Sequence, residues 1–297
     1  MRLDELALRA ARRPDGRWRV EKNSTYKRSY VVAEKKLLKH FGPNALVEDL
    51  TPAGIANWCA FMEKQARRGH YAIRTVNTYL STARAMLNAT GFSLLADAVE
   101  LLPQPPPRDR SMKQKTFRQL VRHANVRDAA ILWLLWESGR RRATICQLRT
   151  GPEYMQIYQG PDGRFRFVAK GIVEKGRQPV LCFAGHPAAL AVLLWMALRP
   201  DPHSPWLFTH LDSGDPLSPD TITNIFHKLR QKAKVPADEN AFAHACRHAF
   251  AQRKLNEYDQ RLVADWMGIR VHTLLEVYAT RDEATLEALF FGDSDLP

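Results

Sequence analysis

Residues 155–183 read MQIYQGPDGRFRFVAKGIVEKGRQPVLCF, and here the pattern of apolar residues changes from helical to extended. Apolar and polar side chains alternate in MQIYQ and in FRFVAKGIVE, and the PDGR between them is typical of a tight turn. PVLCF adds a third apolar segment of strand length. We therefore predict a small antiparallel sheet in this part of the chain.

Helical spacing of apolar residues flanks the predicted sheet on both sides. Upstream, KTFRQLVRHANVRDAAILWLLWESG (residues 115–139) reads as two helices, and downstream helical patterns resume at Pro187. One of these begins at Pro219, with Ser218 in the N-cap position. The predicted fold of residues 112–297 is thus mainly α with a small antiparallel β-sheet (α+β).

A proline-rich segment separates this domain from an N-terminal one. Residues 101–110 read LLPQPPPRDR, whose four prolines exclude a helix, and we place a linker at residues 103–111. Upstream, residues 20–102 carry helical patterns, one of them opened by Thr51 and Pro52 as N-cap and first-turn proline. We expect an all-helical domain at residues 20–102 and a flexible basic arm at residues 1–19.

Composition points to a nucleic-acid partner. Lysine and arginine outnumber the acids 44 to 31, for a net charge of +13, which favours a polyanion such as DNA. The longest apolar run, Ala188–Leu198, is too short to cross a bilayer and is expected to form a buried helix. The first residues lack an apolar signal core, and the four cysteines form no CxxC pair. We expect no export, no membrane, no disulfide framework, no structural zinc and a cytoplasmic location.

Two segments concentrate the side chains that phosphate chemistry uses. FAHACRHAF places His244, Arg247 and His248 on one helix face, where a histidine moves protons and an arginine binds phosphate oxygens. ESGRRRATICQLR brings three arginines into the start of another helix. A solvated basic helix face explains either segment equally well when each is taken alone. The sequence has no Walker loop, GxSxG elbow or HExxH motif, so we expect neither a metal nor a cofactor.

The order of these segments resembles the tyrosine recombinase (phage integrase) family. SGRRRATICQLR is similar to its first-arginine box, HACRHAFA to its His-x-x-Arg-His box, and LVADWMGIRVHTLLEVYA to its last box. In the last box, Tyr278 follows Gly268 by ten residues, as the family's nucleophile follows its glycine. The N-terminal helical region resembles the family's core-binding domain, and residues 112–297 resemble its catalytic domain.

The resemblance implies a site-specific DNA recombinase that forms a 3′-phosphotyrosine intermediate without metal or ATP. It implies Tyr278 as the nucleophile, Arg141 and Arg247 as phosphate ligands and His244 as the group that helps take the tyrosine proton. A hairpin lysine would protonate the leaving oxygen. We favour Lys175 for that role, with Lys170 as the alternative.

Two positions depart from the family pattern. Ile269 stands where a histidine or tryptophan usually follows the glycine, and His272 is a possible substitute. Thr144 replaces the acidic residue that usually supports the first arginine. Both departures motivate an alternative, a sequence-specific DNA-binding protein with reduced or lost catalysis. A type IB topoisomerase-like enzyme is a further alternative, which the separate N-terminal domain disfavours.

The resemblance also implies double-stranded DNA as the partner and a nucleoid-associated homotetramer on paired sites. Neighbouring subunits would exchange the apolar C-terminal segment ATLEALFFG (residues 284–292), although docking of this segment on its own subunit is an alternative. Integration of a mobile element, plasmid resolution and chromosome-dimer resolution remain open as biological roles.

Overall fold

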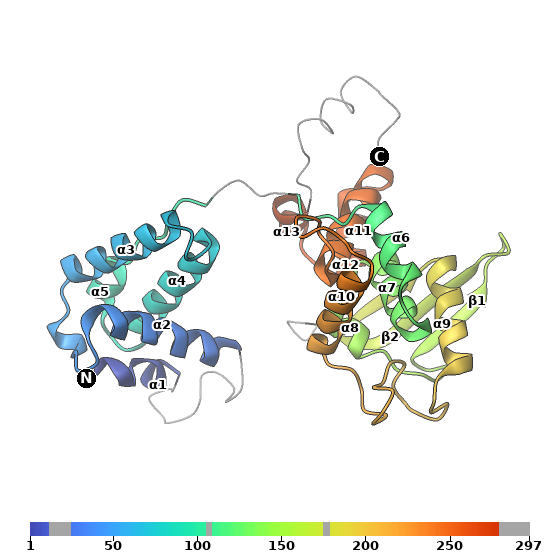
Figure 1. Ribbon diagram of the computed structural model, residues 1–297, viewed down its shortest axis with the longest axis horizontal. Helices are drawn as coiled ribbons and strands as arrows, with labels where there is room; N and C mark the ends of the chain where they lie inside the picture. Colours follow the sequence, from blue (N-terminus) through green and yellow to red (C-terminus); the bar gives the residue numbers. More distant parts are fainter. Residues whose placement is uncertain (12–24, 105–108, 175–178, 279–297) are drawn as a thin grey trace, which may run out of the picture. The chain divides into compact units, whose positions relative to one another are not determined.

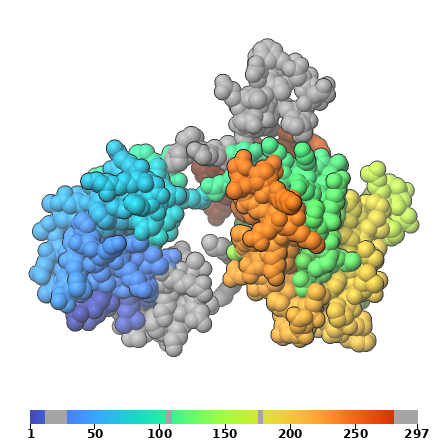
Figure 2. All heavy atoms as spheres, in the orientation of Figure 1, coloured from blue at the N-terminus to red at the C-terminus, as the bar shows by residue number. Residues whose placement is uncertain are grey.

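The computed structural model describes residues 1–11, 25–104, 109–174 and 179–278. The chain divides into two compact units, Met1–Pro106 and Pro107–Pro297, and each has its own hydrophobic core. Figures 1 and 2 show the described residues of the first unit in blue to cyan and those of the second unit from green to red. The boundary between the units falls inside the predicted linker, residues 103–111.

The described part of the first unit consists of helices. As predicted, α3 begins at Pro52, and the hydroxyl of Thr51 accepts a hydrogen bond from the backbone N–H of Gly54 at 3.1 Å. The apolar faces of the helices meet around Trp58 and Leu80, both of which are fully buried. The elements are η1 (Leu3–Glu5), α1 (Leu6–Ala10), α2 (Thr25–Phe41), η2 (Val47–Asp49), α3 (Pro52–Arg67), α4 (Ile73–Ala89) and α5 (Ser93–Asp97).

The first eleven residues are part of this core, and this corrects the expected basic arm at residues 1–19. Leu3 and Leu6 are fully buried, and the backbone N–H of Leu3 donates to the carbonyl of Ala45 at 2.9 Å. The physical reason is an apolar stripe on η1 and α1 that the arginines of this segment obscure in the sequence. Residues 12–19 of the expected arm lie outside the described residues.

The second unit places helices around the predicted three-stranded antiparallel sheet, whose strand order is β1-β2-β3. The register between β2 and β3 shifts between Ala169 and Ile172, where Gly171 has a φ of 75°. Ser218 caps α10 as predicted, since its hydroxyl accepts from the N–H of Thr221 at 3.1 Å. The elements are α6 (Gln114–Arg122), α7 (Val126–Ser138), α8 (Arg142–Cys146), β1 (Met155–Gln159), β2 (Phe165–Val173), β3 (Pro179–Ala184), α9 (His186–Leu198), α10 (Pro219–Lys232), α11 (Ala243–Glu257), α12 (Gln260–Met267) and α13 (Val271–Val277).

The apolar run at residues 188–198 forms most of α9, but only one face of this helix is buried. Val192 and Trp195 face the core, whereas Leu194 and Leu198 are 53% and 60% exposed. The expected buried helix is therefore present but is buried on one face only, because an apolar sequence leaves the buried face of a helix undefined. None of the described helices is long and apolar enough to span a membrane.

Candidate active site

The first arginine segment begins at a left-handed glycine. α7 ends at Ser138, and Gly139 follows with a φ of 60°, a conformation that glycine adopts without strain. A Cβ atom at Gly139 would overlap the ring of Phe250, so only a glycine lets this turn pack directly against α11. Arg141 then stands at the N-cap position of α8, where its backbone is extended. The turn therefore places the arginines between two helices of the second unit.

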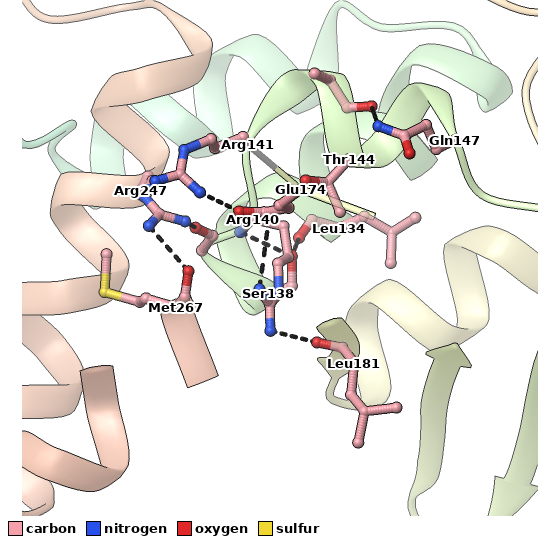
Figure 3. A network of polar contacts seen from close by, with 12 residues as sticks. Leu134, Ser138, Arg140, Arg141, Thr144, Gln147, Glu174, Leu181, Arg247 and Met267 are labelled. Carbon is pink, nitrogen blue, oxygen red and sulfur yellow. Dashed lines mark hydrogen bonds and ion pairs between the residues drawn. The ribbon is translucent and has the colours of Figure 1, made fainter. Parts of the chain in front are cut away.

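Arg247 on α11 connects three segments that lie far apart in the sequence. Its side chain is fully buried, and its guanidinium donates to the carbonyl of Gly139 (Nη1–O 2.6 Å) and to that of Met267 (Nη2–O 3.0 Å; Figure 3). Its Nε donates to the hydroxyl of Tyr278 at 3.1 Å. One side chain thus holds together the glycine turn, the end of α12 and the residue that follows α13.

Tyr278 lies directly on the His-x-x-Arg-His segment of α11. Gly268 ends α12 with a φ of 63°, α13 follows, and Tyr278 stands at its C-terminal end with 4% of its surface exposed. The hydroxyl of Tyr278 lies 3.5 Å from Nε2 of His244. Its ring centroid lies 4.6 Å from that of His248. The phenol is therefore in contact with an arginine and within reach of a histidine, as a nucleophile needs for activation.

Burial shifts the pKa of two of these side chains. It lowers the pKa of Arg247, while the neighbouring Tyr278 hydroxyl opposes this effect, and a guanidinium remains charged in proteins. Burial also lowers the pKa of His248 to about 4, with the charge of His244 as the next cause. His248 is therefore neutral near pH 7, where it packs against Tyr278 as an uncharged ring.

Glu174, which directly follows β2, binds the first arginine segment (Figure 3). Its carboxylate accepts hydrogen bonds from Nη1 of Arg141 and from the hydroxyl of Thr144, and Nη1 of Arg140 lies 3.6 Å from its Oε1. Arg140 is itself buried and also donates to the carbonyl of Leu181 on β3. The sheet and the arginine turn are thus joined through one buried carboxylate.

The structure brings together most of the side chains that the sequence proposed. His244, Arg247 and Tyr278 are in contact, and the charge of Arg141 is close enough to lower the pKa of Arg247. Figure 3 shows the guanidinium of Arg141 beside that of Arg247. Arg141, His244, Arg247 and Tyr278 therefore form one candidate site.

The other proposed residues lie elsewhere or are not described. Lys170 is an exposed residue of β2, and Lys175 lies outside the described residues. His272 is not part of the site, because its side chain is 79% exposed and pairs with Glu276 at 3.1 Å. Ile269 packs against the cluster that contains Tyr278, so an apolar side chain occupies the position next to Gly268.

Sequence reasoning did not find Glu174. A signal for it exists in the strand pattern, because Ile172 faces the core and Glu174 follows at the same parity. A carboxylate that faces the core beside a sheet needs a cation as its partner. The arginines of the first arginine box could have been recognised as candidates for that partner. In the described ranges, no group of three or more His, Cys, Asp or Glu side chains is placed to hold a metal ion.

Comparisons with known proteins agree with this geometry. The model of the phage integrase family matches residues 110–284. Tyrosine recombinase XerA of Pyrococcus horikoshii is 24% identical over 221 residues, which cover 71% of each chain. Tyrosine recombinase XerA of Pyrococcus furiosus is 24% identical over 224 residues, which cover 73% of each chain.

Solved structures share the fold at low sequence identity. The XerH site-specific recombinase bound to palindromic difH substrate in a post-cleavage complex has a TM-score of 0.68 at 14% identity, covering 89% of this chain and 78% of that one. The Tn1549 transposon integrase in complex with circular intermediate DNA has a TM-score of 0.67 at 14% identity, covering 99% and 100%. These likenesses establish the fold of a tyrosine recombinase for the chain.

Proposed function

The chain belongs to the phage integrase family of tyrosine recombinases, and from this premise we propose that it cuts and rejoins duplex DNA at specific sites through a 3′-phosphotyrosine intermediate. One observation carries the proposal: the Tyr278 hydroxyl accepts a hydrogen bond from Arg247 at 3.1 Å and lies 3.5 Å from Nε2 of His244. A phenol has a pKa near 10, so at neutral pH it needs such neighbours to become a nucleophile.

In the proposed first step, Oη of Tyr278 attacks the phosphorus of a phosphodiester. A bond forms between Oη and phosphorus, and the bond from phosphorus to the 5′-oxygen breaks. The phenolic proton passes to His244, and the 5′-oxygen leaves as a hydroxyl after protonation by a lysine. The 5′-hydroxyl of a second strand reverses these steps and completes the exchange, with the phosphodiester's energy kept in the covalent intermediate.

Two arginines stabilise the charge that develops on the non-bridging oxygens in this scheme. Arg141 presents a side chain that is 35% exposed, whereas Arg247 is held rigidly by the carbonyls of Gly139 and Met267. A preorganised donor of this kind is typically worth about 10²- to 10³-fold in rate. We propose Lys175 as the acid for the leaving oxygen, with Lys170 as the alternative.

We propose double-stranded DNA as the partner. The net charge of +13 favours a polyanion, and both the XerH recombinase and the Tn1549 integrase were solved with DNA, which supports the same partner here. A tetramer on paired sites, a place of action at the nucleoid and a role in moving a mobile element are parts of the same proposal.

The experiment that tests the proposal uses nicked duplexes tiled across the DNA that flanks the gene. When the nick lies next to the cleavage position, the short fragment that carries the new 5′-hydroxyl diffuses away after cleavage, and the covalent complex is trapped. A denaturing gel separates this complex from free DNA. We expect an adduct with the wild type and none with Tyr278→Phe. Tyr258→Phe, which changes an exposed tyrosine directly after α11, is the matched control and should retain the adduct.

A DNA-binding protein without catalysis is the second candidate, and one observation favours it. Ile269 replaces the usual histidine or tryptophan, and the possible substitute His272 points into solvent in a pair with Glu276. Specific binding by the wild type with no adduct on a nicked duplex that contains the bound site would establish this candidate instead.

A further inference from the structure

We propose that Glu174 is a positioning residue for strand cleavage, which holds Arg141 in the orientation that receives the scissile phosphate. The inference rests on the proposed function. Its basis is the distribution of contacts around the Glu174 carboxylate, which lies between the sheet and the arginine turn.

The two carboxylate oxygens of Glu174 have different partners. Oε1 accepts a hydrogen bond from the Thr144 hydroxyl and lies 3.6 Å from Nη1 of the buried Arg140. Oε2 accepts from Nη1 of Arg141, whose side chain is 35% exposed, while that of Glu174 is only 4% exposed. The carboxylate is thus fixed on its buried side and presents its second oxygen to the arginine that faces solvent.

This arrangement restricts a side chain that would otherwise sample many rotamers. An arginine loses considerable rotamer freedom when it binds a phosphate, and a partner that fixes it beforehand removes part of that cost from the reaction. A carboxylate at Nη1 leaves the other guanidinium donors of Arg141 for phosphate oxygens. Glu174 therefore orients Arg141 without taking up all of its donors.

The same contacts account for the threonine at position 144. Because the hydroxyl of Thr144 donates to Glu174, the carboxylate lies within reach of the side chain at position 144. The carboxylate that supports Arg141 therefore comes from the end of β2, and Thr144 on α8 binds it through a hydrogen bond. Thr144→Glu is then expected to supply a carboxylate to the same location.

Glu174 also compensates the charge of Arg140, and a test has to separate this role from positioning. Arg140 is 2% exposed, and in the described part of the chain its Nε and Nη1 have no hydrogen-bond partner. Removal of the Glu174 charge would leave a buried cation unpaired, which destabilises a fold. Arg140→Met removes that cation, so in the double variant Arg140→Met/Glu174→Gln no buried cation is left unpaired at this position.

The experiment measures single-turnover adduct formation by the full chain on the nicked duplex, together with DNA affinity and thermal midpoint. We expect Glu174→Gln to form adduct about 10- to 100-fold more slowly at unchanged DNA affinity, as loss of a supporting contact typically does. Arg140→Met/Glu174→Gln should stay slow when folded, and Thr144→Glu/Glu174→Gln should recover most of the rate. Asp162→Asn, which breaks an exposed acid–arginine pair with Arg166, is the matched control and should leave the rate unchanged.

A double-mutant cycle identifies the residue through which Glu174 acts. In an Arg141→Ala background, Glu174→Gln should cause no further loss, because the two changes remove one function. A wild-type rate in Glu174→Gln, or in the double variant with Arg140→Met, would overturn the inference and leave the proposed function standing. A wild type that binds its site without forming adduct would overturn the proposed function, and the inference with it.

Discussion

Replacement of Arg247 by methionine should loosen three segments of the second unit at once. Methionine keeps the apolar stem but donates no hydrogen bond, so the carbonyls of Gly139 and Met267 lose their buried donor. A buried acceptor without a partner costs roughly 1–3 kcal/mol, which gives roughly 2–6 kcal/mol for two. Release of a buried cation offsets part of this cost, so we expect a loss of about 2–3 kcal/mol.

Hydrogen exchange followed by mass spectrometry measures this loss where it arises. About 2–3 kcal/mol corresponds to roughly 30- to 150-fold faster exchange. The effect should appear in peptides that cover residues 139–146 and 263–277, and peptides from α3 and α4 of the first unit serve as the internal reference. Tyr278→Phe removes only the contacts of the hydroxyl with Arg247 and His244 and should accelerate exchange by about tenfold or less.

Two outcomes of the exchange measurement would refute the dependence of these segments on Arg247. If Arg247→Met exchanges within about threefold of the wild type at residues 139–146 and 263–277, then the two carbonyls do not depend on this guanidinium. The same conclusion follows if exchange accelerates equally in α3 and α4, because a general loosening would not come from these contacts.

Three further predictions concern single positions. Gly139→Ala should lower the urea midpoint through roughly 1–3 kcal/mol of overpacking against Phe250, and this cost should be smaller when it is measured in a Phe250→Ala background; no shift would contradict the close packing. Because burial lowers the folded pKa of His248 to about 4 from its ordinary value near 6.5, its contribution to stability is present above about pH 6.5 and is lost as the pH falls toward 4. The thermal midpoint of the wild type should therefore fall more steeply over this range than that of His248→Phe, and parallel curves would argue against it. Lys175→Ala should slow cleavage on an ordinary nicked duplex, whereas Lys170→Ala should not. On a duplex with sulfur at the bridging 5′ position, Lys175→Ala should approach the wild-type rate, because a thiolate leaves without a proton. If Lys170→Ala is the variant that is slow and is rescued by sulfur, then Lys170 is the acid instead of Lys175.

The sequence allowed the fold class and the segments of the candidate site to be predicted, because these depend on local pattern. The change from helical to alternating period at residue 155 predicted the sheet, and the capping residues Thr51 and Ser218 marked two helix starts correctly. The resemblance of the last box to that of tyrosine recombinases, in which Tyr278 follows Gly268 by ten residues, singled out this tyrosine, and Tyr278 does contact Arg247. Local rules suffice for the sheet and the helix starts, whereas the tyrosine required the family pattern.

Features that depend on tertiary contacts were not predictable in the same way. The contacts of Glu174 depend on the shift in the β2–β3 register near Gly171. A glycine within a strand suggests such a shift, but it does not determine the register that follows. The first eleven residues of the expected arm were misjudged because their arginines outweighed an apolar stripe that includes Leu3 and Leu6. His272 has suitable chemistry, but its position on α13 directs it to solvent. The contacts of Glu174 and of Leu3 come from distant parts of the chain, whereas His272 pairs with Glu276 on its own helix.

The hydrogen bonds of Arg247 also bear on how such a protein would lose its activity over generations. Tyr278 contributes only the contacts of its hydroxyl with Arg247 and His244, so a lineage released from selection for strand exchange would tolerate its replacement early. Arg247 would persist much longer, since its loss opens the turn at Gly139 and the end of α12 together. In a distant relative, a retained arginine at this position is thus a sign of an intact fold, and only a retained tyrosine is a sign of a working enzyme.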